Sequence, residues 1–193
     1  MGNCFIAGLM TCQLGHESYS VFGLYLIIIS IFHFSEYLTI ALVNPKSLSL
    51  NSFLINHSRE YCLAAIGSWI EFSIECYLFS QMKTIKIISY FGLLLCLFGE
   101  VIRKLAMITA GSNFNHIIQS QKSDDHVLVT NGIYSISRHP SYLGWFWWSI
   151  GTQVIKFDGK HFMQLINCFV YISVDSHQSN LHCLLCTCKL VIF

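Results

Sequence analysis

The apolar run Ser20–Val43, SVFGLYLIIISIFHFSEYLTIALV, decides the fold class of this sequence. A helix needs about 20 mostly apolar residues to cross the hydrocarbon core of a bilayer. The run stops at Asn44-Pro45, because proline lacks a backbone N–H and disfavours helix in the residue before it. It therefore predicts a membrane-spanning helix that ends at Val43.

The rest of the chain has the same apolar character. Of its 193 residues, 54% are hydrophobic and only 11% are charged, which lies outside the range of a soluble domain. Three further candidate spans follow the first one, and the last of them is shorter and rich in tryptophan: His57–Gln81, Thr84–Ala110 and Pro140–Ile155. We therefore predict an all-α fold, a polytopic integral membrane helical bundle.

We expect the chain to have three parts. Residues 1–19 hold the apolar stretch Asn3–Leu14, which is too short to span a bilayer alone. We expect it to be the remnant of a truncated N-terminal membrane helix. Residues 20–155 form the expected membrane domain. Residues 156–193 contain two short apolar runs around a polar patch, and we expect this tail to lie outside the fold of the membrane domain.

The charge and disulfide patterns exclude two further classes of protein. The formal net charge is +1 and the eleven Lys and Arg residues are scattered, so we expect no nucleic-acid partner. Cys62, Cys76 and Cys96 fall inside apolar segments without the spacing of a disulfide framework. We expect these cysteines to be reduced.

The carboxyl end of the chain contains the residue types of a metal site. His177, His182, Cys183, Cys186 and Cys188 are of the residue types that zinc prefers. No second ligand pair from a distant segment completes the cluster, and its surroundings are apolar. We therefore expect no metal.

Charged side chains inside the predicted spans are informative, because an ionisable group in the bilayer is costly unless it is paired or faces a polar cavity. Three sets each share one helical face: His33 with Glu36, Glu71 with Glu75, and Glu100 with Arg103 and Lys104. The last set has the composition of an ion pair, although its two cations could equally snorkel to the interface. The like-charged Glu71 and Glu75 are expected to face the interior of the bundle.

A polar stretch at 111–126 precedes the tryptophan-rich helix. A connector of about 20 residues without regular structure is uncommon in a compact fold unless it serves a site, the alternative being a simple connection. Asn131-Gly132 then predicts a tight turn, and Pro140 suits the first turn of a helix. His139 and Tyr142 would share a helix face, beside free N–H groups that can hold an anion.

The stretch HVLVTNGIYSISRHPSYLGW, residues 126–145, resembles the signature of the isoprenylcysteine carboxyl methyltransferases. The flanking segments AGSNFNH at 110–116 and NPKSLSL at 44–50 strengthen the resemblance, which covers residues 20–155. The inner pattern Gly-x-Tyr-x-x-x-Arg-His-Pro is less specific, because phospholipid methyltransferases and, more loosely, sterol reductases share it. The flanking segments favour the first family.

The resemblance implies a multi-pass enzyme of the endoplasmic reticulum membrane that uses S-adenosylmethionine. It would methylate the α-carboxylate of the prenylated C-terminal cysteine of CaaX proteins, with the lipid bilayer as its solvent. The polar loop before the tryptophan-rich helix would then help to bind the cofactor. The positions that match the cofactor-binding residues of the family are Gln119, His126, Val127, Leu128, Val129, Tyr134, His139, Pro140, Ser141 and Tyr142.

The chemistry of such a reaction requires few polar residues. A free α-carboxylate is ionised at neutral pH, because its pKa is about 3.5, so the nucleophile needs no general base. Alignment with the methyl donor is the main task. A soluble Rossmann-type methyltransferase is excluded, because no two glycines in this chain lie closer than six positions, and that site needs a glycine-rich turn.

The sequence departs from the family after the tryptophan-rich helix. The family continues into a helix whose arginine and glutamates complete the cofactor and substrate sites, but here no arginine follows Arg138 and no glutamate follows Glu100. We therefore assign no catalytic residue and expect this chain to have little activity. The alternative is a catalytically inactive membrane protein that keeps a partial cofactor site and binds prenylated partners. A sterol-reductase-like oxidoreductase is a third, more distant possibility.

Overall fold

The computed structural model has four helices and four short 3-10 turns with defined bounds, and the isolated described residues between 66 and 77 are helical as well. The helices are α1 (Gly2–Gln13), α2 (Glu17–Val43), α4 (Lys86–Ala110) and α5 (Pro140–Lys156). The 3-10 turns are η1 (Pro45–Ser47), η2 (Leu50–Phe53), η3 (Gly111–Asn113) and η4 (Gly132–Ser135). The structure describes residues 2–13, 17–54, 66–67, 69–70, 72–74, 77, 86–114, 116 and 127–156. The all-α prediction is confirmed over these residues, which contain no strand.

The observed helix bounds lie close to the predicted ones. Helix α2 ends at Val43, directly before Asn44-Pro45, and Pro45 opens η1. Helix α4 ends at Ala110, where Gly111 takes a positive φ of 57° that stops the helix. Helix α5 begins at Pro140, as expected of a proline in the first turn.

Several predictions fall on parts of the chain outside the described residues. The span expected at 57–81 is described only at isolated positions, and its Glu71 and Glu75 are not among them. The tail from residue 157 onward, with its histidine and cysteine cluster, also lies outside. In the part of the chain that is described, no group of three His, Cys, Asp or Glu side chains could hold a metal ion.

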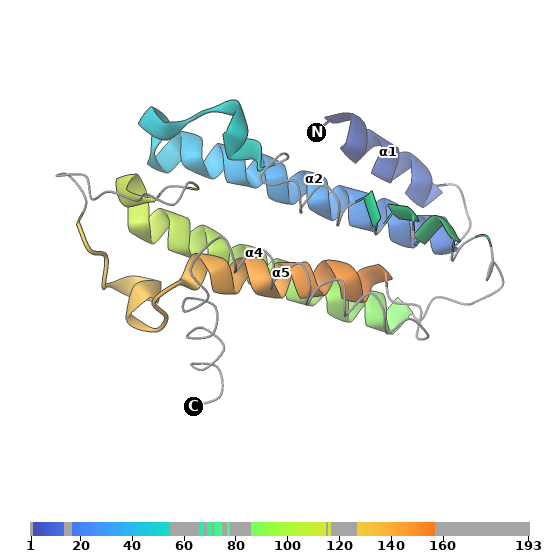
Figure 1. The fold of residues 1–193 in the computed structure, drawn as a ribbon. Coiled ribbons are helices and arrows are strands. Elements are labelled where there is room, and N and C mark those ends of the chain that lie inside the picture. Colours follow the sequence, from blue (N-terminus) through green and yellow to red (C-terminus); the bar gives the residue numbers. More distant parts are fainter. Residues whose placement is uncertain are drawn as a thin grey trace.

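Helices α4 and α5 form the most extensive helix contact and lie side by side in Figure 1. They are antiparallel, because Gly99 meets Gly144 while Gly92 meets Gly151. A Cβ atom on Gly151 would lie 2.7 Å from the carbonyl oxygen of Gly92, closer than real Cβ atoms come. The four glycines, spaced seven residues apart on each helix, therefore form a seam along which the two backbones touch, as small residues allow in membrane helices.

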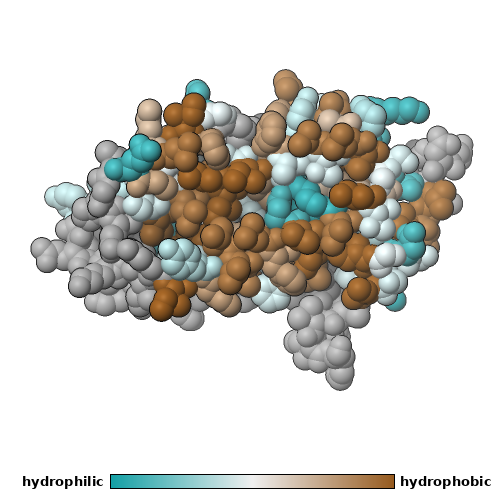
Figure 2. Space-filling view, turned by 180° about the vertical axis from the view of Figure 1, so that it is seen from behind, coloured by the Kyte–Doolittle hydropathy of each residue, from teal (hydrophilic) through white to brown (hydrophobic). Residues whose placement is uncertain are grey.

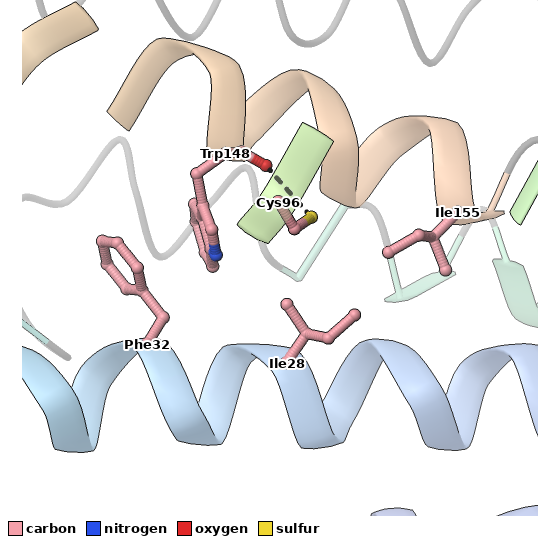
Figure 3. Close-up of a cluster of buried hydrophobic side chains, with 5 residues drawn as sticks. All are labelled: Ile28, Phe32, Cys96, Trp148 and Ile155. Carbon is pink, nitrogen blue, oxygen red and sulfur yellow. Dashed lines mark hydrogen bonds between the residues drawn. The ribbon is translucent and has the colours of Figure 1, made fainter. Parts of the chain in front are cut away.

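Helix α2 packs across this pair and runs parallel to α4, with Ile28 level with Cys96 and Ile40 level with Met107. Figure 3 shows the core between the three helices, in which the ring of Phe32 on α2 stacks on Trp148 of α5. The ring centroids are 3.9 Å apart and the planes are inclined by 23°. Aromatic stacking of this kind adds about 0.5–1.5 kcal/mol to the burial of the rings.

The cysteine prediction can be checked at one of its three positions. Cys96 is buried in the core, and its thiol donates a hydrogen bond to the carbonyl oxygen of Trp148 at 3.6 Å (Figure 3). It is a free thiol, like Cys4 and Cys12 among the described cysteines.

The outer surface of the bundle is apolar. Figure 2 shows hydrophobic residues over most of the described part of one face, with a small hydrophilic patch between them. Helix α4 exposes large hydrophobic side chains along its whole length: Ile87, Tyr90, Phe91, Leu94, Leu97, Phe98, Val101, Leu105 and Ile108. Among the described helices, Tyr19–Val43 is long and apolar enough to cross a membrane by length and composition, with a mean hydropathy of 2.0.

Candidate functional site

The segment that precedes α5 lies against the carboxyl end of α4. The backbone N–H of Val127 donates to the side-chain oxygen of Asn113 at 3.2 Å. Gly132 takes a positive φ of 56°, which agrees with the tight turn predicted at Asn131-Gly132. A Cβ atom on Gly132 would lie 3.1 Å from the methyl group of Thr109, so this turn sits close to the surface of α4.

Tyr134 in η4 is the member of this segment that reaches the core. It packs against the cluster formed by Ile40, Met107, Ala110 and Phe114. Burial raises the pKa of its phenol, and the nearby Arg103 opposes that shift. Tyr134 is therefore a neutral, half-buried ring close to a guanidinium.

The start of α5 has the geometry that the sequence predicted. The carbonyl oxygen of His139 accepts the N–H of Leu143 at 3.2 Å, and its own N–H donates to Ser137 Oγ at 3.4 Å. The rings of His139 and Tyr142 lie one turn apart on the same face, with centroids separated by 6.3 Å. Helix α5 thus presents an imidazole, a phenol and the N–H groups of its first turn together.

The environment of His139 favours its neutral form. Partial burial lowers the pKa of the imidazole, and the adjacent Arg138 lowers it further. Because the pKa in the folded protein lies below the unfolded value of about 6.5, the unfolded chain takes up this proton first as the pH falls. Stability associated with His139 is therefore present above about pH 6.5 and decreases below it.

We expect the variant His139→Gln to reduce the dependence of stability on pH. Between about pH 7.5 and 5.5, the unfolding temperature of the wild type in detergent should fall more than that of the variant. The measurement is thermal unfolding at a series of pH values with fixed salt. Equal slopes for the two proteins would contradict the assignment.

A buried group of charges lies directly beneath the start of α5. Glu36 of α2 is 0% exposed and Arg103 of α4 is 7% exposed. The guanidinium donates to both carboxylate oxygens, from Nε to Oε1 at 2.8 Å and from Nη2 to Oε2 at 2.9 Å. Lys104 Nζ also donates to Glu36 Oε1. This two-point contact with additional hydrogen bonds is the geometry in which a buried ion pair can be retained.

A second carboxylate completes the charge balance of the group. Glu100 lies 3.3 Å from Lys104 Nζ and accepts a hydrogen bond from Ser35. The Nε2 atom of His116 lies 3.6 Å from Glu36 Oε2. The two carboxylates and the two cations Arg103 and Lys104 cancel, so the group is close to neutral when His116 is unprotonated.

The predicted pairing of these charges was only partly correct. Glu100 does pair with Lys104, but Arg103 turns to Glu36 on another helix and does not snorkel to the interface. His33 interacts electrostatically with Glu36, whose helical face it shares, and its Nδ1 also lies 2.7 Å from the carbonyl oxygen of Phe53, a contact that helical spacing did not predict. Helical spacing finds partners within one helix, whereas these contacts form between separate segments.

The guanidinium of Arg103 joins this group to the predicted cofactor segment. Its Nη1 atom donates to the backbone oxygen of Ser141 at 3.2 Å and to Ser141 Oγ at 3.1 Å. Tyr134 and Tyr142 are also within electrostatic reach of Arg103. The sequence offered no signal for the contact with Ser141, because it joins positions 38 residues apart.

The predicted cofactor residues fall into three sets. Tyr134, Ser141 and Tyr142 gather around Arg103, with His139 and Pro140 on the same helix start. Val127 and Leu128 are exposed, and Val129 is partly buried, in the extended segment that leads to η4. Gln119 and His126 lie outside the described residues, so the structure does not place them.

The residues that gather here fit a ligand that carries both a cation and a carboxylate. The N–H groups at the start of a long helix can hold an anion, and the faces of tyrosine rings attract a cation such as a sulfonium. S-adenosylmethionine has both groups. The fit rests on Tyr134, His139 and Tyr142 and on the first turn of α5.

An apolar bundle with a buried charge cluster beneath a polar helix start is typical of an integral membrane protein. Residues 92–177 match the sequence profile of the Isoprenylcysteine carboxyl methyltransferase (ICMT) family, a range that runs past residue 155. A protein-S-isoprenylcysteine O-methyltransferase from Xenopus laevis is 56% identical over 155 residues, which cover 80% of this chain and 54% of the relative. The Homo sapiens protein of the same name is 54% identical over 156 residues, 79% of this chain and 55% of that protein.

A solved structure also resembles this chain. It is the eukaryotic intramembrane Ras methyltransferase ICMT (isoprenylcysteine carboxyl methyltransferase), with a TM-score of 0.83 and 45% sequence identity. The likeness covers 92% of this chain and 63% of that one. The chain is thus similar to the isoprenylcysteine carboxyl methyltransferases over most of its length, and it spans about half the length of the curated relatives it matches.

Proposed function

We propose that this chain belongs to an enzyme that transfers a methyl group from S-adenosylmethionine to the C-terminal carboxylate of a prenylated cysteine. The observation that carries the proposal is the likeness to the intramembrane Ras methyltransferase, at 45% identity and a TM-score of 0.83. The residues around Arg103 support it, because they include five of the ten positions that the family resemblance assigns to the cofactor. Prenylated CaaX proteins would be the substrates.

The residues near the start of α5 have distinct physical roles in the proposed site. The first turn of α5 would hold the carboxylate of the cofactor through its N–H groups. Tyr134 and Tyr142 would offer their rings to the sulfonium. His139 is neutral near pH 7 because burial and Arg138 lower its pKa, so it adds no positive charge that would repel the sulfonium.

The reaction itself requires no proton transfer by the protein. S-adenosylmethionine supplies an electrophilic methyl group on a sulfonium. The substrate carboxylate is already ionised at neutral pH and can attack this methyl directly. The chain's own task is to place the two groups in line and exclude water, and correct placement alone can lower a barrier by about 7–11 kcal/mol.

We further propose that the chain crosses the endoplasmic reticulum membrane several times. Helix α4 has 25 residues and is about 37 Å long, enough for a hydrocarbon core of about 30 Å. Its charges Glu100, Arg103 and Lys104 turn inward while its outer face is apolar throughout. Because α2 and α4 run parallel, the chain must also return across the bundle between them, and the span predicted at 57–81 meets that requirement.

The activity of this particular chain is a separate proposal. No arginine follows Arg138 and no glutamate follows Glu100, so residues 139–193 lack the arginine expected to orient the substrate carboxylate. We infer that the chain binds the cofactor but turns over slowly. The same observation favours the second candidate, an inactive membrane protein that binds prenylated partners.

An assay on membranes that contain this chain tests both proposals. The membranes receive radiolabelled S-adenosylmethionine and a farnesyl-cysteine analogue, and base-labile methyl ester is counted. Retained cofactor with little ester supports the impaired or inactive protein, and rapid ester formation would overturn the inference of slow turnover. Absence of cofactor binding would contradict the proposed function itself.

The variant Tyr134→Leu should weaken the binding of S-adenosylmethionine by about tenfold, because leucine preserves the apolar contact with the core cluster around Met107 but has no ring for the sulfonium. The measurement is equilibrium binding of the labelled cofactor to purified protein in detergent. Tyr90→Leu is the matched control, since Tyr90 is exposed on α4 near its amino end. Equal losses in the two variants would argue against a cofactor role for Tyr134.

A further inference from the structure

Arg103 uses one guanidinium to join three helices. Its Nε and Nη2 atoms hold Glu36 on α2, and its Nη1 atom holds the backbone oxygen and Oγ of Ser141 on α5. The side chain itself belongs to α4. Among the described residues, no other side chain is seen to connect these three helices by hydrogen bonds.

The geometry fixes the direction in which Arg103 presents its remaining N–H groups. A guanidinium is planar, and a two-point contact with a carboxylate allows little rotation. Glu36 is fully buried, and the ring of Phe32 lies 5.6 Å from the guanidinium carbon. Glu36 therefore determines how Arg103 contacts Ser141, although Glu36 itself makes no hydrogen bond to Ser141.

Neutralising Glu36 does not explain the contact with Ser141. Lys104 already donates to Glu36 and could balance its charge. Arg103 adds contacts that a lysine cannot make at the same time, because an ammonium is a single point of charge. Ser141 lies between Pro140 and Tyr142, in the first turn of α5 where the cofactor is proposed to bind.

We propose that Glu36 and Arg103 are positioning residues, which orient the first turn of α5 and thereby set the affinity for the methyl donor. Only the statement about affinity for the methyl donor rests on the proposed function. The orientation of the first turn can be tested without any ligand.

The test compares Arg103→Lys with Lys104→Met in the full chain. Arg103→Lys keeps the positive charge but loses the planar contact, whereas Lys104→Met removes the other cation on Glu36 and leaves Ser141 untouched. The first measurement is amide hydrogen exchange at 143–145, whose N–H groups bond to the first turn, with 148–152 as the internal reference. The second is the dissociation constant for radiolabelled S-adenosylmethionine.

In Arg103→Lys, exchange at 143–145 should become about tenfold faster while 148–152 is unchanged, and the cofactor should bind about tenfold more weakly. Lys104→Met should change each quantity by less than about twofold. Adding Ser141→Ala to Arg103→Lys should cost less affinity than Ser141→Ala costs alone, because the two residues act through one contact.

Each contrary result identifies which statement fails. Unchanged exchange at 143–145 in Arg103→Lys would overturn the positioning role, and faster exchange along all of α5 would show a general structural role instead. Faster local exchange with unaltered affinity would overturn the link to the methyl donor. A wild type that binds no cofactor, yet shows the expected exchange, would support the positioning of the first turn and refute the proposed function.

Discussion

Replacing Gly99 by leucine is expected to lower the stability of the chain by about 3 kcal/mol, since overpacking at a site that cannot yield is among the costlier core changes. The first side-chain atom would meet the carbonyl oxygen of Gly144 and the amide nitrogen of Trp148, both closer than real Cβ atoms come to other atoms. These are backbone atoms, so the clash is relieved only if α4 and α5 separate. Trp148, whose ring stacks on Phe32 of α2, lies at this contact, so its packing would be disturbed as well.

The measurement for Gly99→Leu is thermal unfolding in detergent, where the midpoint should fall by about 6–12 °C. Gly67→Leu is the matched control, because a Cβ atom on Gly67 meets nothing within 4 Å. It should leave the midpoint within about 2 °C of the wild type. If Gly99→Leu unfolds at the same midpoint as the wild type, the two backbones do not touch along the glycine seam.

Replacing Glu36 by leucine is expected to destabilise the chain by about 3–5 kcal/mol, the usual cost of removing one partner from a buried ion pair. The variant leaves Arg103 buried without its carboxylate. Lys104 keeps a partner in Glu100. The penalty therefore falls mainly on the guanidinium.

A second variant identifies the guanidinium as the source of that loss. Glu36→Leu combined with Arg103→Met replaces both charges by apolar groups, which is often neutral for a buried pair. We expect the double variant to unfold at a higher temperature than Glu36→Leu alone. A double variant that is less stable than Glu36→Leu would show that Arg103 stabilises the fold by some means other than its pairing with Glu36.

Local features of the sequence predicted the helices well. The ends of α2 and α4 and the start of α5 depend on proline and glycine, whose backbone effects act at the residue itself and need no tertiary contact. The shared face of His139 and Tyr142 also follows from helical spacing. Such effects can be derived without knowing which helices are neighbours.

The contacts between helices could not be derived in the same way. The spacing of Glu100, Arg103 and Lys104 suggested pairing within α4, but the pairing of Arg103 with Glu36 depends on how α2 packs against α4. The glycines spaced by seven on α4 and α5 are visible in the sequence, yet their meeting in pairs depends on the register of two antiparallel helices. Their spacing was the one signal that could have predicted this packing.

The pairing of Glu36 with Arg103 has a consequence for biogenesis. Placing a single arginine at the centre of a helix opposes membrane insertion by about 2.5–3.5 kcal/mol, and α4 carries two lysines and a glutamate besides. During synthesis α2 leaves the ribosome before α4, so the carboxylate that neutralises Arg103 can already be in the bilayer when α4 arrives. The hydrophobic helix α2 would then be inserted first. The charged helix α4 would follow, with the counter-ion for Arg103 already in the membrane.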